Sequence, residues 1–154
     1  MRVVIQRVKS ASISIEDNEA QHMGQGLVVL FGVSEQDKED VNPTLIEKLA
    51  AKTANLRIFS DNNSKMNLSA GDLNLSIMVV SQFTLFADTK KGNRPSFIAA
   101  AEPSFAESIY ERFLTELKKY NWKEFLTGSF RKHMVVGIEN DGPVTIIIDT
   151  KEWE

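Results

Sequence analysis

The chain of 154 residues contains no cysteine. This excludes a disulfide framework, a thiolate zinc site, a CxxC redox pair and a cysteine nucleophile. The sequence has only two histidines, His22 and His133, which are too few for a multi-histidine metal centre. HExxH and EF-hand patterns are also missing. We therefore expect no bound metal.

Long hydrophobic runs are missing as well. Charged residues interrupt the stretch Met1–Val8 before it reaches the length of a signal peptide's apolar region, and no other segment approaches the ~18 apolar residues of a membrane helix. The net charge of −3 gives no overall basic field, so charge alone predicts no adhesion to nucleic acid or membrane. We expect a cytoplasmic protein with no membrane partner.

The composition, 42% hydrophobic and 25% charged residues, is that of an ordinary globular domain. No internal repeat, low-complexity tract or Pro/Gly-rich linker divides the chain. We therefore expect one domain over residues 1–154.

Alternation and apolar runs predict several β-strands. The run 27–33 is apolar on both faces, which is typical of a buried central strand. Lys9 and Ser10 are expected near a connection, and the turn-rich segment 139–143 is expected to join the last two strands. The predicted strands are 2–8, 11–15, 27–33, 75–80, 134–138 and 144–149.

Two helices are predicted from their start signals. Asn42 and Pro43 have the character of an N-cap and first helical residue, and Pro103 opens a second helix with Lys118 and Lys119 in its last turn. The expected fold class is therefore α/β (α+β), with mixed β-sheets and two main helices packed on one side.

Most familiar catalytic motifs are absent. The sequence has no Gly-x-Ser-x-Gly, no Walker loop and no GxGxxG, and its carboxylates are scattered. A triad of Ser81 or Thr84 with His133 stays open, because triads are assembled in space rather than in sequence.

Two segments resist a purely structural interpretation. In Ser81–Leu85 polar residues follow an apolar strand, and the alternation by itself would bury Phe83 and Leu85. Asn140–Thr145 has the composition of a hairpin turn.

Together these two segments closely resemble the signature motifs of the D-aminoacyl-tRNA deacylases of bacteria and eukaryotes. The likeness extends over nearly the whole chain, in ordered blocks. The blocks are Ile5–Val8, Arg57–Asp61 with Lys65–Asn67, Val79–Leu85, Arg94–Phe97, Thr127–Gly128 with Phe130 and Met134, and Asn140–Thr145.

The resemblance implies the fold of that family and hydrolysis of the ester bond of D-aminoacyl-tRNA. It also implies hydrolytic release of glycine that has been wrongly attached to tRNA-Ala. No cofactor is implied. Gly142 and Pro143 would form a cis dipeptide that reaches into the pocket of a second subunit, so the partners are tRNA and a second copy of this chain. This dipeptide would reject L-amino acids by steric clash, and Arg7 would support it.

The resemblance also implies a catalytic role for the first segment. The ribose 2′-hydroxyl of the terminal adenosine would assist hydrolysis, while backbone N–H groups near Phe83 and Thr84 hold the ester carbonyl. Ser81 and Gln82 would lie along the adenosine and the ester. Phe130 and Met134 would line the adenosine side.

Two other functions, and one question about a basic segment, stay open at this point. The chain could be a noncatalytic homodimeric module that binds RNA ends, or an esterase with Thr84 or Ser81 as nucleophile. Separately, Lys90, Lys91 and Arg94 either meet acceptor-stem phosphates or form a solvated surface loop.

Overall fold

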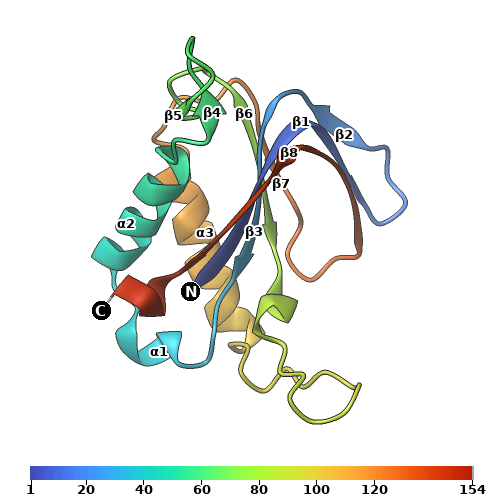
Figure 1. Cartoon of the computed structure of the whole chain (residues 1–154). Coiled ribbons are helices and arrows are strands. Elements are labelled where there is room, and N and C mark those ends of the chain that lie inside the picture. Colours follow the sequence, from blue (N-terminus) through green and yellow to red (C-terminus); the bar gives the residue numbers. More distant parts are fainter. Residues whose placement is uncertain (154) are drawn as a thin grey trace.

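The computed structural model describes residues 1–153. Its main sheet has six strands in the order β2-β1-β3-β6-β7, with β8 paired to the other edge of β1 (Figure 1). Strands β4 and β5 form a separate two-stranded sheet. The strands are β1 (Arg2–Ile15), β2 (Gln21–Met23), β3 (Gly26–Gly32), β4 (Phe59–Ser60), β5 (Met66–Leu68), β6 (Ser76–Ser81), β7 (Phe125–Thr127) and β8 (Met134–Asp149).

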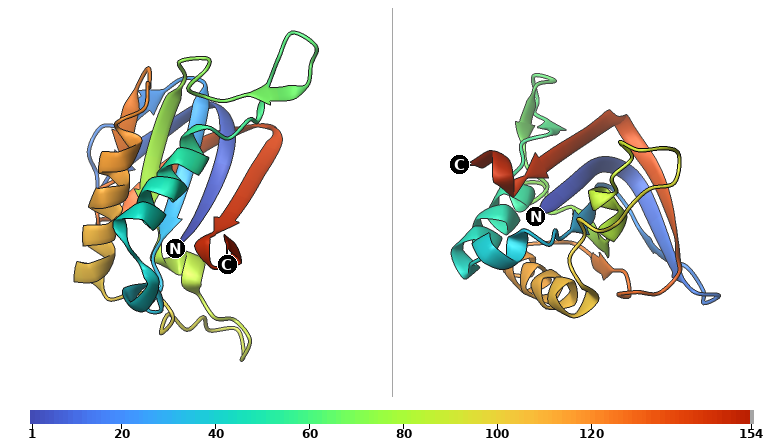
Figure 2. Two further views of the ribbon diagram at one scale, coloured as in Figure 1. Left: turned by 90° about the vertical axis from the view of Figure 1, so that its left-hand side faces the viewer. Right: turned by 90° about the horizontal axis from the view of Figure 1, so that it is seen from below.

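The sheet combines both pairing modes. Strand β3 pairs with β6, and β6 with β7, in parallel, whereas β1 is antiparallel to each of its partners. Strand β3 is buried over almost its whole length, which confirms the predicted central strand. The sheet curves strongly, and β1 and β8 bend together (Figure 2).

Helices α2 (Pro43–Ala54) and α3 (Pro103–Leu117) pack together on one face of the sheet (Figures 1 and 2). The predicted N-cap is confirmed, since the Asn42 Oδ1 accepts a hydrogen bond from the Leu45 N–H at 2.9 Å. Short helices complete the chain: α1 (Asp37–Asp40), η1 (Phe83–Phe86) and η2 (Thr150–Trp153).

The end of α3 differs from the prediction. The helix stops at Leu117, so Lys118 is its C-cap and Lys119 lies beyond it. The Trp122 indole N–H donates to the Leu117 carbonyl at 2.8 Å, and the Tyr120 N–H donates to the same oxygen at 3.1 Å. These bonds satisfy a carbonyl that a longer helix would have used.

Two hydrophobic cores follow from strand alternation. Val29 on β3 and Val79 on β6 face the helices, whereas their neighbours Val28 and Met78 face the opposite side of the sheet. The second core is completed by β1, from Val8 onward, and by β2.

The predicted breaks in the first and last strands are wrong, because each pair of strands is one continuous strand. Lys9 is an extra residue in β1, where Val8 pairs with Asn140 and Ser10 pairs with Glu139. This bulge reverses the alternation, so that Ala11 faces the second core. On β8 the residues between Asn140 and Thr145 bulge outward instead of turning the chain back.

The fold class predicted from the sequence, mixed α/β with both main helices on one side, is confirmed. The short elements of the structure were not predicted: the β4–β5 hairpin, the strands β2 and β7, the helix α1 and the 3₁₀ turns η1 and η2.

Candidate active site

A cavity of about 480 Å³ opens at the carboxyl ends of the parallel strands β3 and β6. Ligand sites of α/β proteins commonly lie at this edge of a sheet. The cavity is bounded by η1, the start of α3, and the connection from β7 to β8. Its lining is Phe31, Gly32, Val33, Ser81, Phe83, Phe97, Ala100, Ala101, Pro103, Ala106, Phe130, Arg131, Lys132 and Met134.

Close packing of backbone against backbone fixes η1 at the rim of the cavity. The Gln82 N–H donates to the Phe31 carbonyl at 2.7 Å. A Cβ atom on Gly32 would lie 3.0 Å from the Gln82 carbonyl oxygen and 3.2 Å from the Leu85 Cβ. Glycine at this position therefore allows η1 to rest directly on the end of β3.

The 3₁₀ turn presents Phe83 to the cavity. The Phe83 side chain is 54% exposed and packs edge-to-face on Phe97, with the ring centroids 5.1 Å apart. The prediction that Phe83 is buried in the core is therefore wrong. It assumed the two-residue period of a strand, whereas η1 has a three-residue period.

Two backbone donors are free in this turn. In the part of the chain that the structure describes, the N–H groups of Phe83 and Thr84 donate no hydrogen bond. The Gln82 side-chain amide donates to the Thr84 hydroxyl oxygen and so ties the side chains of the turn together. Two N–H groups beside an open cavity can stabilise negative charge on an oxygen.

Arg2 anchors the far end of η1, a role that the sequence did not indicate. Its Nη1 donates to the Leu85 carbonyl at 2.8 Å, and its guanidinium lies 4.8 Å from the centre of the Phe86 ring. Asp149 at the end of β8 accepts from Nε and Nη2 of the same guanidinium at 3.0 and 2.8 Å.

The charge of Asp149 is stabilised in this position. Burial acts to raise the pKa of its carboxyl group, but hydrogen bonds from the Lys151 N–H and from Arg2 outweigh burial. The pKa of Asp149 therefore lies below its usual value, and the ion pair with Arg2 persists at neutral pH.

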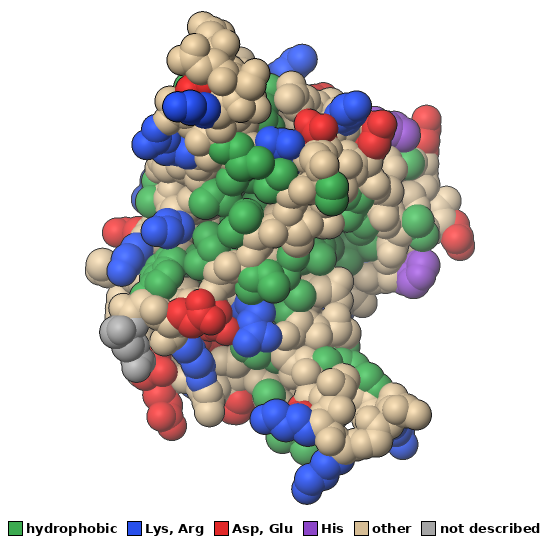
Figure 3. All heavy atoms as spheres, viewed as in Figure 1, with side chains coloured by type: hydrophobic (Ala, Val, Ile, Leu, Met, Phe, Trp, Pro, Cys, Tyr) green, Lys and Arg blue, Asp and Glu red, His purple; other side chains and the backbone are tan. Residues whose placement is uncertain are grey.

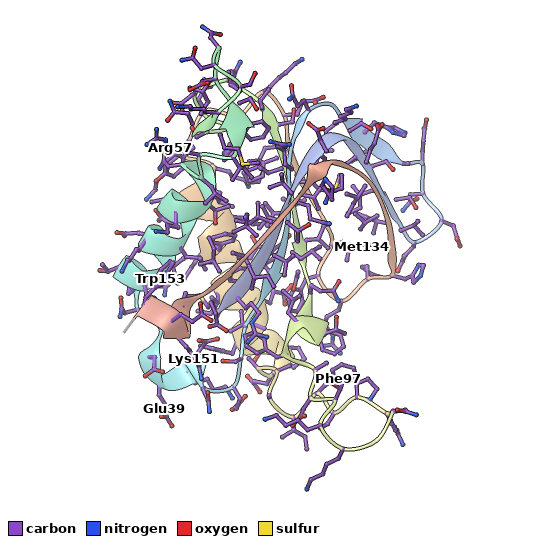
Figure 4. The ribbon with its side chains drawn as sticks, in the orientation of Figure 1. Glu39, Arg57, Phe97, Met134, Lys151 and Trp153 are labelled. Atoms are coloured by element: carbon purple, nitrogen blue, oxygen red, sulfur yellow. The ribbon has the colours of Figure 1, made fainter. Side chains whose placement is uncertain are left out.

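The opposite wall carries the other two expected cavity residues, Phe130 and Met134. The Phe130 ring lies 6.2 Å from the ring of Tyr110, whose hydroxyl donates to the Val79 carbonyl at 2.8 Å. Burial, and secondarily the Glu111 carboxylate, raises the pKa of Tyr110, so this hydroxyl stays protonated. Figure 4 labels Met134 at the start of β8 and Phe97 in the loop after η1, both of which line the cavity.

The second predicted segment lies outside this cavity. Gly142 and Pro143 are exposed on the bulge of β8 and are joined by a cis peptide bond. Gly142 has φ +128°, and a Cβ there would lie 2.8 Å from Nη2 of Arg7 and 2.9 Å from Cγ2 of Val144. This position therefore requires glycine.

Arg7 holds the bulge from inside. Its Nε donates to the Asp141 carbonyl at 2.9 Å, and its Nη1 donates to the Ile58 carbonyl at 2.6 Å. The Asp141 carboxylate lies 3.7 Å from the same guanidinium. Arg7 thus connects β1, the residues before β4, and the bulge of β8.

The structure consequently divides the predicted residues into two groups. Ser81, Phe83, Phe130 and Met134 line one cavity, with Gln82 and Thr84 at its rim. Arg7, Gly142 and Pro143 form a separate surface that contributes nothing to the cavity of the same chain.

The described residues assemble neither the Ser/Thr–His133 triad nor a metal site. Within residues 1–153 no hydrogen bond joins the His133 side chain to Ser81 or Thr84, and no three His, Asp or Glu side chains gather as metal ligands. No helix in that range is both long and apolar enough to cross a membrane.

Comparison with known proteins identifies the family. A family model described as D-Tyr-tRNA(Tyr) deacylase matches residues 4–149. The chain belongs to this family. The resemblance drawn from the motifs is thereby confirmed, and with it the predicted enzyme class, a hydrolase of ester bonds.

Several relatives match along their whole length. A D-aminoacyl-tRNA deacylase from Thermosipho africanus is 48% identical over 99% of both chains, and one from Cytophaga hutchinsonii is 49% identical over 98% of both. A solved structure of a c-Myc DNA Unwinding Element Binding Protein is 37% identical, with a TM-score of 0.86 over 97% of this chain and 98% of that one. A probable eukaryotic D-amino acid tRNA deacylase shares the fold at 16% identity, with a TM-score of 0.81 over 96% and 97% of the two chains.

Proposed function

We propose that this enzyme hydrolyses the ester bond of D-aminoacyl-tRNA and releases a free D-amino acid and tRNA. Full-length relatives at nearly half identity bear the name D-aminoacyl-tRNA deacylase. The observation that carries the proposal is the aromatic cavity beside two free N–H groups at the ends of β3 and β6.

The cavity suits a nucleoside. Its volume, about 480 Å³, falls within the ~300–1,000 Å³ typical of small-molecule sites. Phe83, Phe97 and Phe130 offer rings from different walls, and unpaired bases stack readily on aromatic side chains. The terminal adenosine of tRNA therefore fits here, with Met134 beside Phe130.

The ester would then lie against η1. Water adds to the carbonyl carbon, the bond from that carbon to the ribose oxygen breaks, and the ribose oxygen takes up a proton. The N–H groups of Phe83 and Thr84 stabilise the oxyanion, and the neighbouring ribose 2′-hydroxyl assists proton transfer. Ser81 and Gln82 position the substrate rather than attack it.

The exposed bulge of β8 would supply the chiral filter to a second subunit. Gly142 and Pro143 are exposed on the bulge, and Ile147 beyond them is 64% exposed. An apolar exposed strand with a rigidly held bulge suits a contact between two copies of this chain. Inserted beside the substrate α-carbon, the Gly-Pro backbone excludes an L side chain and admits D-amino acids and glycine, including glycine mischarged on tRNA-Ala.

The test is release of labelled amino acid from matched D-aminoacyl-, L-aminoacyl- and glycyl-tRNA. The proposal predicts rapid loss from the D and glycyl forms and survival of the L form. Equal hydrolysis of D and L forms would contradict the chiral filter. Replacing the terminal ribose by its 2′-deoxy form should stop the reaction, and full activity there would contradict the assistance by RNA. A cytoplasmic location stays a prediction.

A noncatalytic nucleic-acid-binding module is the second candidate, because one similar structure carries the name of a DNA-binding protein. This candidate predicts tight binding of charged tRNA without release of the amino acid. An esterase with Thr84 or Ser81 as nucleophile predicts instead that small esters lacking ribose are cleaved, and that Thr84→Ala or Ser81→Ala abolishes hydrolysis.

A further inference from the structure

A basic hairpin follows η1 and projects from the rim of the cavity. The Asp88 N–H donates to the Ser96 carbonyl at 2.7 Å, and the Ser96 N–H donates back to the Asp88 carbonyl at 2.9 Å. The Asp88 carboxylate accepts from the Lys90 N–H at 2.9 Å, and Gly92 at the tip has φ +70°. An antiparallel bridge thus closes this loop at its base, and residues 88–96 are called the basic hairpin.

The tip of this hairpin carries cations that lack partners. Lys90, Lys91 and Arg94 are exposed, and within residues 1–153 no carboxylate lies within 4 Å of their charged groups. By contrast, Lys38 and Lys119 are each paired with a glutamate. Figure 3 shows Lys and Arg side chains gathered on the lobe formed by the loop between η1 and α3. In a chain of net charge −3, this concentration is local.

The hairpin is connected directly to the cavity. Phe97, which follows the Asp88–Ser96 bridge, lines the cavity and packs on Phe83. Across the opening, Arg131 and Lys132 also line the cavity.

We propose that this basic hairpin, residues 88–96, binds the phosphate backbone of the RNA whose terminal nucleoside occupies the cavity. The inference rests on the proposed function, which brings an RNA 3′ end to that position. The nucleotides that precede the terminal one must leave through the mouth of the cavity, where the hairpin projects. Cations on flexible side chains contact phosphates without reading the sequence, so one hairpin serves different tRNAs.

The consequence is a division between affinity and chemistry. Phosphate contacts strengthen binding of a long RNA but touch neither the ester nor η1. They should lower KM for tRNA and make it sensitive to salt, because neutralising phosphates releases counterions. A substrate without these phosphates gains nothing from them.

The test uses the triple variant Lys90→Gln, Lys91→Gln, Arg94→Gln with two substrates, D-aminoacyl-tRNA and D-aminoacyl-adenosine. We expect KM for the tRNA ester to rise about 10-fold or more, with kcat unchanged. The slope of log(kcat/KM) against log[salt] should become shallower by about 2, at ~0.7 for each lost contact with a single strand. Hydrolysis of the adenosine ester should not change. The matched control is Lys52→Gln, Arg112→Gln, Lys123→Gln, which removes as many exposed cations from α2, α3 and the segment before β7.

An unchanged KM and salt slope for tRNA would overturn the proposal, as would equal losses on both substrates or an equal effect of the control variant. Failure of the proposed function is a separate result, in which the wild-type chain hydrolyses neither substrate. In that case, the affinity of the proteins for uncharged tRNA tests the proposed phosphate contacts. Weaker, less salt-dependent binding by the hairpin variant alone supports the proposal, and identical binding by all three proteins refutes it.

Discussion

The cavity at the ends of β3 and β6 and the bulge on β8 are built in opposite ways. The cavity is a hollow lined by aromatic rings and backbone, with two N–H donors left free. The bulge protrudes, and its position is fixed by Arg7 through two carbonyl groups and by a glycine with positive φ. One region is therefore a hollow open to a ligand, whereas the other is an exposed projection.

The proposed function assigns these two regions different tasks. On that proposal, the cavity would hold the nucleoside and activate the ester in the same way for every amino acid, while the bulge would examine only the substrate α-carbon. Mutations in the two regions should therefore have different kinetic signatures. Cavity variants should alter KM for the RNA, and bulge variants should alter turnover or stereochemical selectivity.

The largest effect is expected from Gly142→Ala. A Cβ at this position would meet Arg7 and Val144 at under 3 Å, and φ +128° is strained for any L side chain. Because the displaced bulge would collide with the substrate in the partner's pocket, we predict at least a 100-fold loss of kcat/KM on D-aminoacyl-tRNA, with binding of uncharged tRNA nearly unchanged. Gly24→Ala is the matched control, because nothing lies within 4 Å of a Cβ there. Full activity of Gly142→Ala would contradict any role of the bulge in deacylation.

Arg7→Lys should have the next largest effect. Lysine keeps the charge but cannot donate to the Asp141 and Ile58 carbonyls at once. Loss of one of these partly buried bonds should cost about 1–3 kcal/mol of unfolding free energy. We predict a fall in kcat of about 10-fold or more without a change in KM, measured by steady-state deacylation. A rise in KM alone would place Arg7 in RNA binding instead.

Phe83→Leu tests the role of the cavity in binding the terminal nucleoside. Base stacking on an aromatic ring contributes about 1–3 kcal/mol, so KM for D-aminoacyl-tRNA should rise about 10-fold. The preference for D over L substrates should stay as in the wild type. Ile98→Ala is the control, since Ile98 is 88% exposed and does not line the cavity. A loss of stereoselectivity in Phe83→Leu would contradict the separation of tasks.

Asp149→Asn tests the anchor of η1 through pH. Because the pKa of Asp149 is lowered in the folded state, its charge stabilises the fold fully above the unfolded value of ~3.9 and progressively less as pH falls below it. The variant should therefore be less stable than the wild type at pH 7, and the difference should shrink towards pH 3. Urea unfolding at both pH values measures this. A difference that does not depend on pH would exclude the ion pair with Arg2 as the cause.

The smallest effect is expected from Tyr110→Phe. The lost hydroxyl bond to the Val79 carbonyl should lower the unfolding free energy by about 1 kcal/mol. The cost stays small because this carbonyl also accepts from the Gly128 N–H at 3.0 Å. Deacylation kinetics should not change, and thermal unfolding provides the measurement.

Sequence periodicity predicted those elements whose hydrophobic pattern agrees with their tertiary environment. Strand β3 is apolar on both faces because helices cover one side and the second core covers the other. The Asn42 cap and Pro43 are local signals that need no tertiary information. Such elements are recoverable from one sequence.

The wrong predictions of chain breaks concern segments in which turn-forming residues lie in β-bulges. Lys9, Ser10 and the segment 139–143 interrupt the alternation, yet they form facing bulges in one long antiparallel pair. A bulge and a turn share the same residue types, and only the pairing partner distinguishes them. The anchor formed by Arg2 was not foreseen because its partners lie 83 and 147 residues away.

The most direct test of the central claim, that the cavity of one subunit works with the bulge of another, is complementation between two inactive variants. Ser81→Tyr fills the cavity, and Gly142→Ala disables the bulge. Each variant alone should be inactive, whereas an equal mixture allowed to exchange subunits should regain about one quarter of the wild-type rate, because half of randomly paired dimers hold one intact site. No recovery in a mixture that demonstrably contains mixed dimers would contradict the account.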